Sequence, residues 1–94
     1  MPGDGDQDWL RFFVGRVVVV ELGEGFTAFG TLDHVGPAHL FLRNVDLHQQ
    51  AEANSSRDVY AIETADIGIR PNRATLAVPL ARVIAICPLA DVVP

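Results

Sequence analysis

Four consecutive valines at positions 17–20 constrain the fold of this chain more than any other feature. β-Branched side chains are stiff and pack well on a pleated surface, so residues 16–22 predict a strand rather than a helix. A strand that is apolar on both faces is expected to be covered on both sides. The Gly-Glu-Gly segment at 23–25 is typical of a hairpin loop between two strands.

The following run, residues 26–35, predicts a second strand with Gly30 in its interior. Glycine weakens an ordinary strand, but it suits a strand that bends sharply or that lies close to another backbone. Gly36-Pro37 predicts a turn, and residues 38–47 predict a third strand. Two sets of side chains alternate along that strand: His39, Phe41, Arg43 and Val45 on one face, and Leu40, Leu42, Asn44 and Asp46 on the other.

Aromatic residues precede the first strand at helical spacing. Trp9, Phe12 and Phe13 stand at i, i+3 and i+4, so a short helix would present them as one apolar stripe. Gly15 suits the left-handed position just beyond the end of such a helix. We expect the stripe to cover the core rather than to stack on a ligand. In the alternative reading, residues 12–14 already belong to the first strand.

The second half of the chain contains one ambiguous segment and two apolar runs. Residues 56–67 favour a short helix that ends at Gly68, although Tyr60 and Ile62 would share one face of a strand. Residues 74–78 predict a strand that ends at Pro79, because proline has no N–H to donate to a ladder. Residues 82–87 predict a last strand, which Pro88 closes.

The length of 94 residues predicts a single domain. We expect a flexible N-terminus at 1–8, a domain at 9–90 with a variable insertion at 48–73, and a tail at 91–94. A chain this short buries only about 60–65% of its unfolded surface. Since 49% of its residues are hydrophobic, we expect part of the apolar surface to lie in a contact between subunits.

The net charge and the cysteine content indicate which classes of partner and which cellular compartment to expect. The net charge is −5, and all seven basic residues are arginines, so the chain lacks the basic excess of most unspecialised nucleic-acid binders. We therefore expect no DNA partner and do not favour RNA. No run approaches the roughly 18 apolar residues of a membrane span, so no membrane partner is expected. The acidic start and the single Cys87 predict a cytoplasmic location.

The order of these elements resembles the Sm-like family, which includes the LSm proteins and bacterial Hfq. The resemblance covers residues 9–47 and resumes at residues 74–88. Four segments carry it: the valine-rich run and glycine loop at 17–25, "GTL" at 30–32, "AHLFL" at 38–42, and "AVPLARVIAICP" at 77–88. It implies a mainly β fold, a small bent five-stranded antiparallel barrel of the Sm-like or SH3-like kind. A short N-terminal helix precedes the barrel, and an extended, helical loop joins its third and fourth strands.

The family's uridine pocket, as the resemblance implies it, has lost its usual residues in this chain. In ring-shaped LSm proteins an aspartate before the third strand, an asparagine within it and an Arg-Gly pair in the second motif hold the base. Here Val35 or Gly36 stands at the aspartate, His39 at the asparagine and Pro79-Leu80 at the Arg-Gly pair. The imidazole ring of His39 is suited to stacking on a nucleobase.

Four residues are the candidates for contact with RNA or another anion: His39, Arg70, Asn72 and Arg73. Two guanidinium groups three residues apart suit forked hydrogen bonds to phosphate or carboxylate. The alternative is that these arginines pair with the chain's own acids or with a neighbouring subunit.

No metal, cofactor or catalytic site is expected. The potential metal ligands are the three histidines and two nearby aspartates: Asp33, His34, His39, Asp46 and His48. Their spacing matches no compact metal-binding motif. Cys87 lies in an apolar run, where an inert buried thiol is commoner than a nucleophile.

Self-association is the remaining expectation. In the family that the chain resembles, the fourth strand of one subunit pairs with the fifth strand of the next. The corresponding runs here lack charges that would protect an exposed edge, and the expected contact residues are Thr75, Leu76, Val78, Val83, Ile84 and Ile86. We expect a homo-oligomer, a ring rather than a two-fold dimer, that acts as a non-catalytic assembly or protein-interaction module. The alternative is a diverged RNA-binding ring with a nonstandard site.

Overall fold

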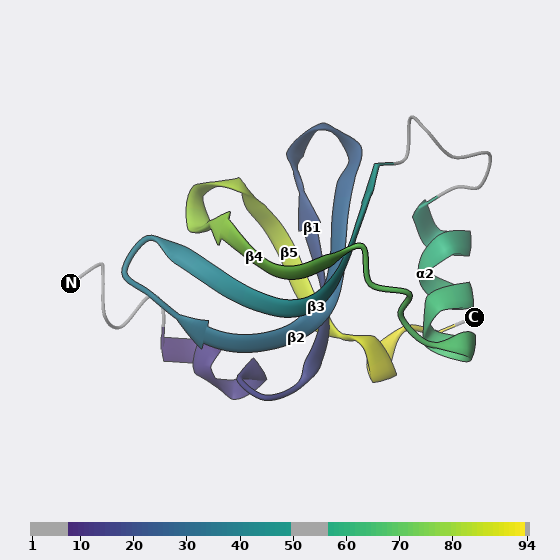
Figure 1. The fold of residues 1–94 in the computed structure, drawn as a ribbon, viewed down its shortest axis with the longest axis horizontal. Helices are drawn as coiled ribbons and strands as arrows, with labels where there is room; N and C mark the ends of the chain where they lie inside the picture. Colours follow the sequence, from purple (N-terminus) through teal and green to yellow (C-terminus); the bar gives the residue numbers. More distant parts are fainter. Residues whose placement is uncertain (1–7, 50–56, 94) are drawn as a thin grey trace.

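Five antiparallel strands form one sheet in the order β4-β3-β2-β1-β5 (Figure 1). The computed structural model describes residues 8–49 and 57–93. The elements are η1 (Asp8–Phe13), β1 (Val17–Leu22), η2 (Gly23–Gly25), β2 (Phe26–Val35), β3 (His39–Gln49), α2 (Arg57–Ile67), β4 (Arg73–Pro79), η4 (Leu80–Arg82), β5 (Val83–Pro88) and η5 (Leu89–Asp91). The predicted five-stranded fold with an N-terminal helix is confirmed, but the barrel is open, because β4 and β5 do not pair with each other in the described ranges.

Some predictions fall on residues outside those ranges. Residues 1–7 of the expected flexible terminus, residues 50–56 of the expected insertion and the last residue of the expected tail lie outside the described residues. Among the described elements, no helix is long and apolar enough to cross a bilayer.

The backbones of β2 and β3 come very close at Gly30. A Cβ atom at this position would lie 3.0 Å from Val45 Cγ2 and 3.1 Å from the carbonyl oxygen of Arg43. The pairing register between the two strands shifts at the same place, between Phe29 and Thr31. Glycine leaves room for this approach, so the close contact predicted from the sequence is confirmed.

A β-bulge in β3 lies opposite Gly30. Asn44 has a left-handed backbone, with φ of 52°, and supplies the extra residue. The bulge reverses the alternation of faces, so that Val45 is buried in the core while Arg43 is exposed. The prediction that Val45 shares a face with His39 and Arg43 was therefore wrong, since strict alternation holds only along a regular strand.

The inner face of the curved sheet holds the main core. Its buried side chains come from η1 and four strands: Leu10, Val18, Val20, Ala28, Leu32, Leu40, Leu42, Val45 and Val78. β5 adds the partly buried Val83 and Ile86.

A second apolar layer lies on the outer face of the sheet, beneath α2. Phe29 is fully buried there, and its ring centroid lies 5.4 Å from that of Tyr60 on α2. Val19 of β1 pairs with Phe29 and is also buried, whereas Val18 and Val20 face the inner core. Val18, Val19 and Val20 are thus covered on both sides of the sheet, as the sequence predicted, whereas Val17 is exposed.

The N-terminal helix forms, but as a 3-10 helix with a different buried face. Three residues per turn place Leu10 and Phe13 on the core side and Trp9 and Phe12 on the solvent side. Trp9 is 49% exposed and Phe12 is 79% exposed, so the expectation that both cover the core was wrong. Gly15 adopts the predicted left-handed conformation, with φ of 83°.

The ambiguous segment is helical, so the strand alternative for it was wrong. α2 ends where Gly68, with φ of 93°, donates its amide to the carbonyl oxygen of Thr64. The alternative that placed residues 12–14 in the first strand was also wrong, because η1 extends to Phe13 and β1 begins at Val17.

Gly30→Val should lower the free energy of unfolding by more than about 2 kcal/mol, because its side chain would push β3 away at Val45. Gly23→Ala is the matched control, since a Cβ there meets nothing within 4 Å, and it should change stability by less than about 0.5 kcal/mol. Urea denaturation followed by circular dichroism measures both. A loss below about 0.5 kcal/mol for Gly30→Val would contradict this reading of the close contact.

Candidate functional site

Two stacked rings mark the surface at the β2–β3 turn. The His34 and Phe41 rings lie with their centroids 4.3 Å apart and their planes 10° apart. The two residues are cross-strand partners, so the sheet itself holds this pair in place. His39 is exposed nearby, with its ring centroid 6.1 Å from that of Phe41.

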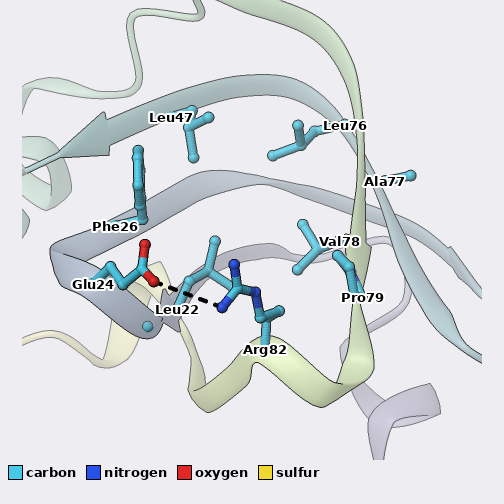
Figure 2. A pocket seen from close by; sticks show the side chains of 10 residues that line it. Leu22, Glu24, Phe26, Leu47, Leu76, Ala77, Val78, Pro79 and Arg82 are labelled. Carbon is cyan, nitrogen blue, oxygen red and sulfur yellow. Dashed lines mark ion pairs between the residues drawn. The ribbon is translucent and has the colours of Figure 1, made fainter.

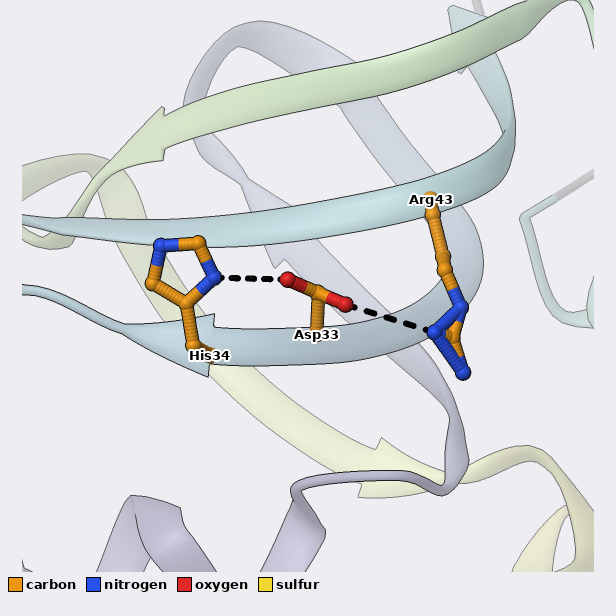
Figure 3. A network of polar contacts seen from close by, with 3 residues as sticks. All are labelled: Asp33, His34 and Arg43. Carbon is orange, nitrogen blue, oxygen red and sulfur yellow. Dashed lines mark hydrogen bonds and ion pairs between the residues drawn. The ribbon is translucent and has the colours of Figure 1, made fainter.

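Asp33 connects this ring pair to Arg43 (Figure 3). The register of β2 shifts between Leu32 and His34, and this bulge allows the neighbouring side chains of Asp33 and His34 to meet. His34 Nδ1 donates to Asp33 Oδ2 at 2.7 Å, and Arg43 Nη1 donates to Asp33 Oδ1 at 3.3 Å. All three side chains are about half exposed, so these contacts orient the side chains more than they stabilise the fold.

The β2–β3 turn lies directly beside the β4–β5 turn. His39 is the cross-strand partner of Pro79, and the Leu80 amide donates to the carbonyl oxygen of Ala38 at 2.9 Å. The structure therefore brings His39 next to Pro79-Leu80. These are the positions at which the family resemblance implies the asparagine and the Arg-Gly pair of the uridine pocket. We name the exposed surface of His34, His39 and Phe41 the ring surface.

Asn72 serves the fold rather than an open site. Its Nδ2 donates to Asp46 Oδ1 and to the carbonyl oxygen of Leu47, both at 3.1 Å. Its Oδ1 accepts from the Leu47 amide at 3.0 Å. The side chain thus joins the segment after α2 to β3, and its polar atoms are occupied.

The predicted anion contacts do not come together. Arg73 pairs with Val45, at the opposite end of β4 from Pro79 and His39, and its Nη1 donates to the Asn72 carbonyl oxygen at 3.0 Å. Arg70 lines a pocket of about 250 Å³ with Tyr60 and Asp46 beneath α2. The four candidates therefore lie at two separate places.

A polar cluster beneath α2 was missed by the sequence analysis. The Tyr60 hydroxyl donates to Asp46 Oδ2, and the Tyr60 ring stacks on His48 with centroids 3.7 Å apart. Asp46 is buried, and its two carboxylate oxygens accept hydrogen bonds from Tyr60 and Asn72. The sequence indicates that Asp46 and His48 share one face of a strand, because they are two residues apart. It does not indicate that the predicted helix packs against that face.

The environment of Tyr60 makes its ionisation unfavourable. Burial raises the pKa of Tyr60 to about 12, helped by its hydrogen bond to Asp46 and by the negative charges of Asp46 and Glu63, while Arg70 acts in the opposite direction. Burial also raises the pKa of the Cys87 thiol, with a further contribution from Asp91 and Glu21. A raised pKa keeps that thiol protonated at neutral pH, which disfavours nucleophilic chemistry.

The five potential metal ligands, among which the sequence predicted no site, are divided between these two places. Asp33, His34 and His39 lie at the ring surface, whereas Asp46 and His48 lie beneath α2. Within residues 8–49 and 57–93, no three His, Cys, Asp or Glu side chains gather as a metal site requires.

The expected contact residues between subunits lie on the two end strands of the sheet. In the described part of the chain, β4 pairs only with β3 and β5 pairs only with β1. Val78 is 2% exposed and lies in the core, so its side chain is not available for a contact between subunits. Thr75 and Ile84 are exposed, and three side chains are half-buried: Leu76, Val83 and Ile86.

A small apolar pocket opens between β4 and the β1–β2 hairpin (Figure 2). Its volume is about 200 Å³, and its walls are Leu22, Gly23, Phe26, Leu47, Leu76, Ala77, Val78 and Pro79. Two exposed charges lie at its rim, where Arg82 Nη1 is 4.0 Å from Glu24 Oε1.

No family model matches the sequence, and no curated protein matches it. Among solved structures, the chain is similar to the Sm protein of Pyrococcus abyssii, whose structure was solved in complex with a uridine heptamer. The superposition has a TM-score of 0.58 and covers 86% of this chain and 93% of that chain, with 18% sequence identity. The chain has the Sm-like fold. The resemblance drawn from the sequence is thus confirmed at the level of the fold, and the bound RNA belongs to the archaeal protein.

Tyr60→Phe should change how the stability of this Sm-like chain depends on pH. Because the pKa of Tyr60 rises from 10.0 to about 12 on folding, the unfolded chain loses this proton first, so the wild type loses stability as the pH rises through that interval. Urea denaturation at pH 8 and at pH 11 measures the loss, which should be smaller in Tyr60→Phe. An equal loss in both proteins would contradict the assigned environment.

Proposed function

We propose that this chain is a non-catalytic Sm-like module that associates with copies of itself through the free edges of β4 and β5. The observation that carries this proposal is the pair of apolar strands at the two ends of one sheet, which have no outer neighbour among residues 8–49 and 57–93. Neither residues 75–78 nor residues 83–88 include a charged side chain. Uncharged edges of this kind favour pairing with another strand.

The backbone of β4 supports the same proposal. The Leu80 amide donates to the Ala38 carbonyl, so His39 and Pro79 form a non-hydrogen-bonded pair, in which the backbone polar groups of each residue point away from the other strand. Alternation along an antiparallel ladder then directs the N–H and C=O groups of Ala77 and Thr75 outward. These groups are available to a strand that adds to the edge.

The contact that we propose is heterologous, because β4 and β5 are different surfaces of the same chain. Such a contact closes into a ring when the rotation between neighbours permits, and it leaves no strand edge exposed in the closed assembly. Pairing also covers apolar surface such as Ile84, which is 68% exposed in the single chain.

Ala77→Pro should reduce the mass in solution to that of a single chain. Proline removes only the outward N–H at this position and leaves the bonds between β4 and β3 in place. Ala77→Gly keeps that N–H and is the control, which should assemble like the wild type. Light scattering after size exclusion measures the mass at micromolar concentration. A wild type that is a monodisperse monomer, or an Ala77→Pro variant that assembles unchanged, would overturn the proposal.

The ring surface favours a second candidate function, which is the binding of single-stranded RNA. The exposed His34 ring, stacked on the half-buried Phe41 ring, is similar to the aromatic side chains on which nucleobases stack in RNA-binding sites. The neighbouring charges favour it less, because the exposed carboxylate of Asp33 engages Arg43 and repels phosphate.

We expect oligo-uridine to bind more weakly than about 1 μM at physiological salt, since the site offers rings but no free guanidinium. Fluorescence anisotropy with a labelled oligo-uridine measures the dissociation constant. A submicromolar value that is lost in His39→Ala and retained in Arg73→Ala, at the far end of β4, would establish RNA binding at the ring surface instead.

A further inference from the structure

The pocket between β4 and the β1–β2 hairpin has the size of a side chain rather than of a metabolite. Its volume of about 200 Å³ is below the roughly 300–1,000 Å³ of typical small-molecule sites. Its walls are apolar, and its only charged side chains, Glu24 and Arg82, are exposed at the rim. The lining therefore suits an aliphatic group that enters from outside.

The pocket also adjoins the free edge of β4. Leu76, Ala77, Val78 and Pro79 form one wall of it. Leu76 and Val78 turn their side chains toward the interior, while the N–H and C=O groups of Ala77 point outward. A free strand edge beside a side-chain pocket is the arrangement by which proteins bind an added strand, because the edge supplies hydrogen bonds and the pocket selects a residue.

Ile84 is the side chain of this chain that matches such a pocket. The register of β5 against β1 shifts between Glu21 and Leu22, whose partners are Ala85 and Val83, so Ile84 is the bulged residue between them. Val83 and Ile86 pack against their own core, but Ile84 is left 68% exposed. A bulge changes the direction of a side chain, and here it leaves an isoleucine unpartnered on an edge strand.

We propose that Ile84 of one copy inserts into this pocket of the next copy when β5 of the first lies along β4 of the second. This inference rests on the proposed self-association, and it specifies the residue that completes the site. The pocket and Ile84 lie on different edges of the sheet, so each copy offers one of each. The contact is repeated around the assembly, with a pocket filled at every step.

Other exposed apolar residues fit this pocket less well. Phe12 and Trp9 are carried by η1, which has no free strand edge to pair with β4. Ile67 has the same exposed fraction as Ile84, 68%, but lies at the end of α2. Strand pairing along β4 therefore favours Ile84, and Ile67 serves as a matched control.

The test is a dilution series of the full chain followed by sedimentation velocity. Ile84→Ala should raise the dissociation constant of the assembly by at least about tenfold, since an isoleucine side chain leaves an apolar pocket. Ile67→Ala should leave it within about twofold, and at dilutions where the wild type is a single chain both variants should keep its thermal midpoint. Leu76→Ala, which opens the pocket wall, should weaken association, and its effect should not add to that of Ile84→Ala if the two side chains touch.

A disulfide test locates the contact directly. In a Cys87→Ala background, chains carrying Ile84→Cys are mixed with chains carrying Leu76→Cys, whose side chain lines the pocket, and are mildly oxidised. A cross-linked pair containing one chain of each kind is expected. An assembly that tolerates Ile84→Ala as well as Ile67→Ala, or that forms no mixed cross-link, overturns this inference but leaves the proposed self-association intact. A monomeric wild type overturns both.

Discussion

The close approach of β2 and β3 at Gly30 is the constraint on which the rest of this structure depends. The absence of a side chain allows Val45 and the Arg43 carbonyl to lie within about van der Waals distance of the β2 backbone. The bulge at Asn44 lies opposite and turns the second half of β3, so that Val45 enters the inner core while Asp46 faces α2. This one contact thereby determines which side chains of β2 and β3 face the inner apolar core and which face the outer layer beneath α2.

The sequence predicts the strands well because their signals are local. The valine run, the Gly-Glu-Gly turn and Gly30 each act within a few residues, and β2 has the predicted bounds. Other features depend on contacts distant in sequence. Asn72 was expected at an anion site, but its amide bridges to Asp46 and Leu47, about 25 residues earlier. The faces of η1 were misplaced because aromatic spacing alone does not distinguish three residues per turn from 3.6.

The same geometry explains why the candidate sites are separate. His39 lies at the start of β3 and Arg73 pairs with Val45 near its bulge, so these two candidates for contact with RNA or an anion occupy different ends of the sheet. What remains at the ring surface is a stacked His34–Phe41 pair beside a carboxylate. Within the described residues, the longest stretches of backbone without a partner strand are instead the outer edges of β4 and β5. No single residue type in a sequence indicates such an edge. The proposed pairing of β4 with β5 of another copy would supply both edges with a partner strand.

Amide hydrogen exchange of the protein at high concentration tests whether the β4 edge is paired. Val19 is the internal standard, because β1 lies between β2 and β5 and its amide is protected in any folded state. The amides of Thr75 and Ala77 point outward and have no partner strand in the single chain. If copies pair through β4 and β5, both amides should exchange nearly as slowly as that of Val19. Exchange of Thr75 and Ala77 at the rate of an unstructured peptide, while Val19 stays protected, would contradict the account.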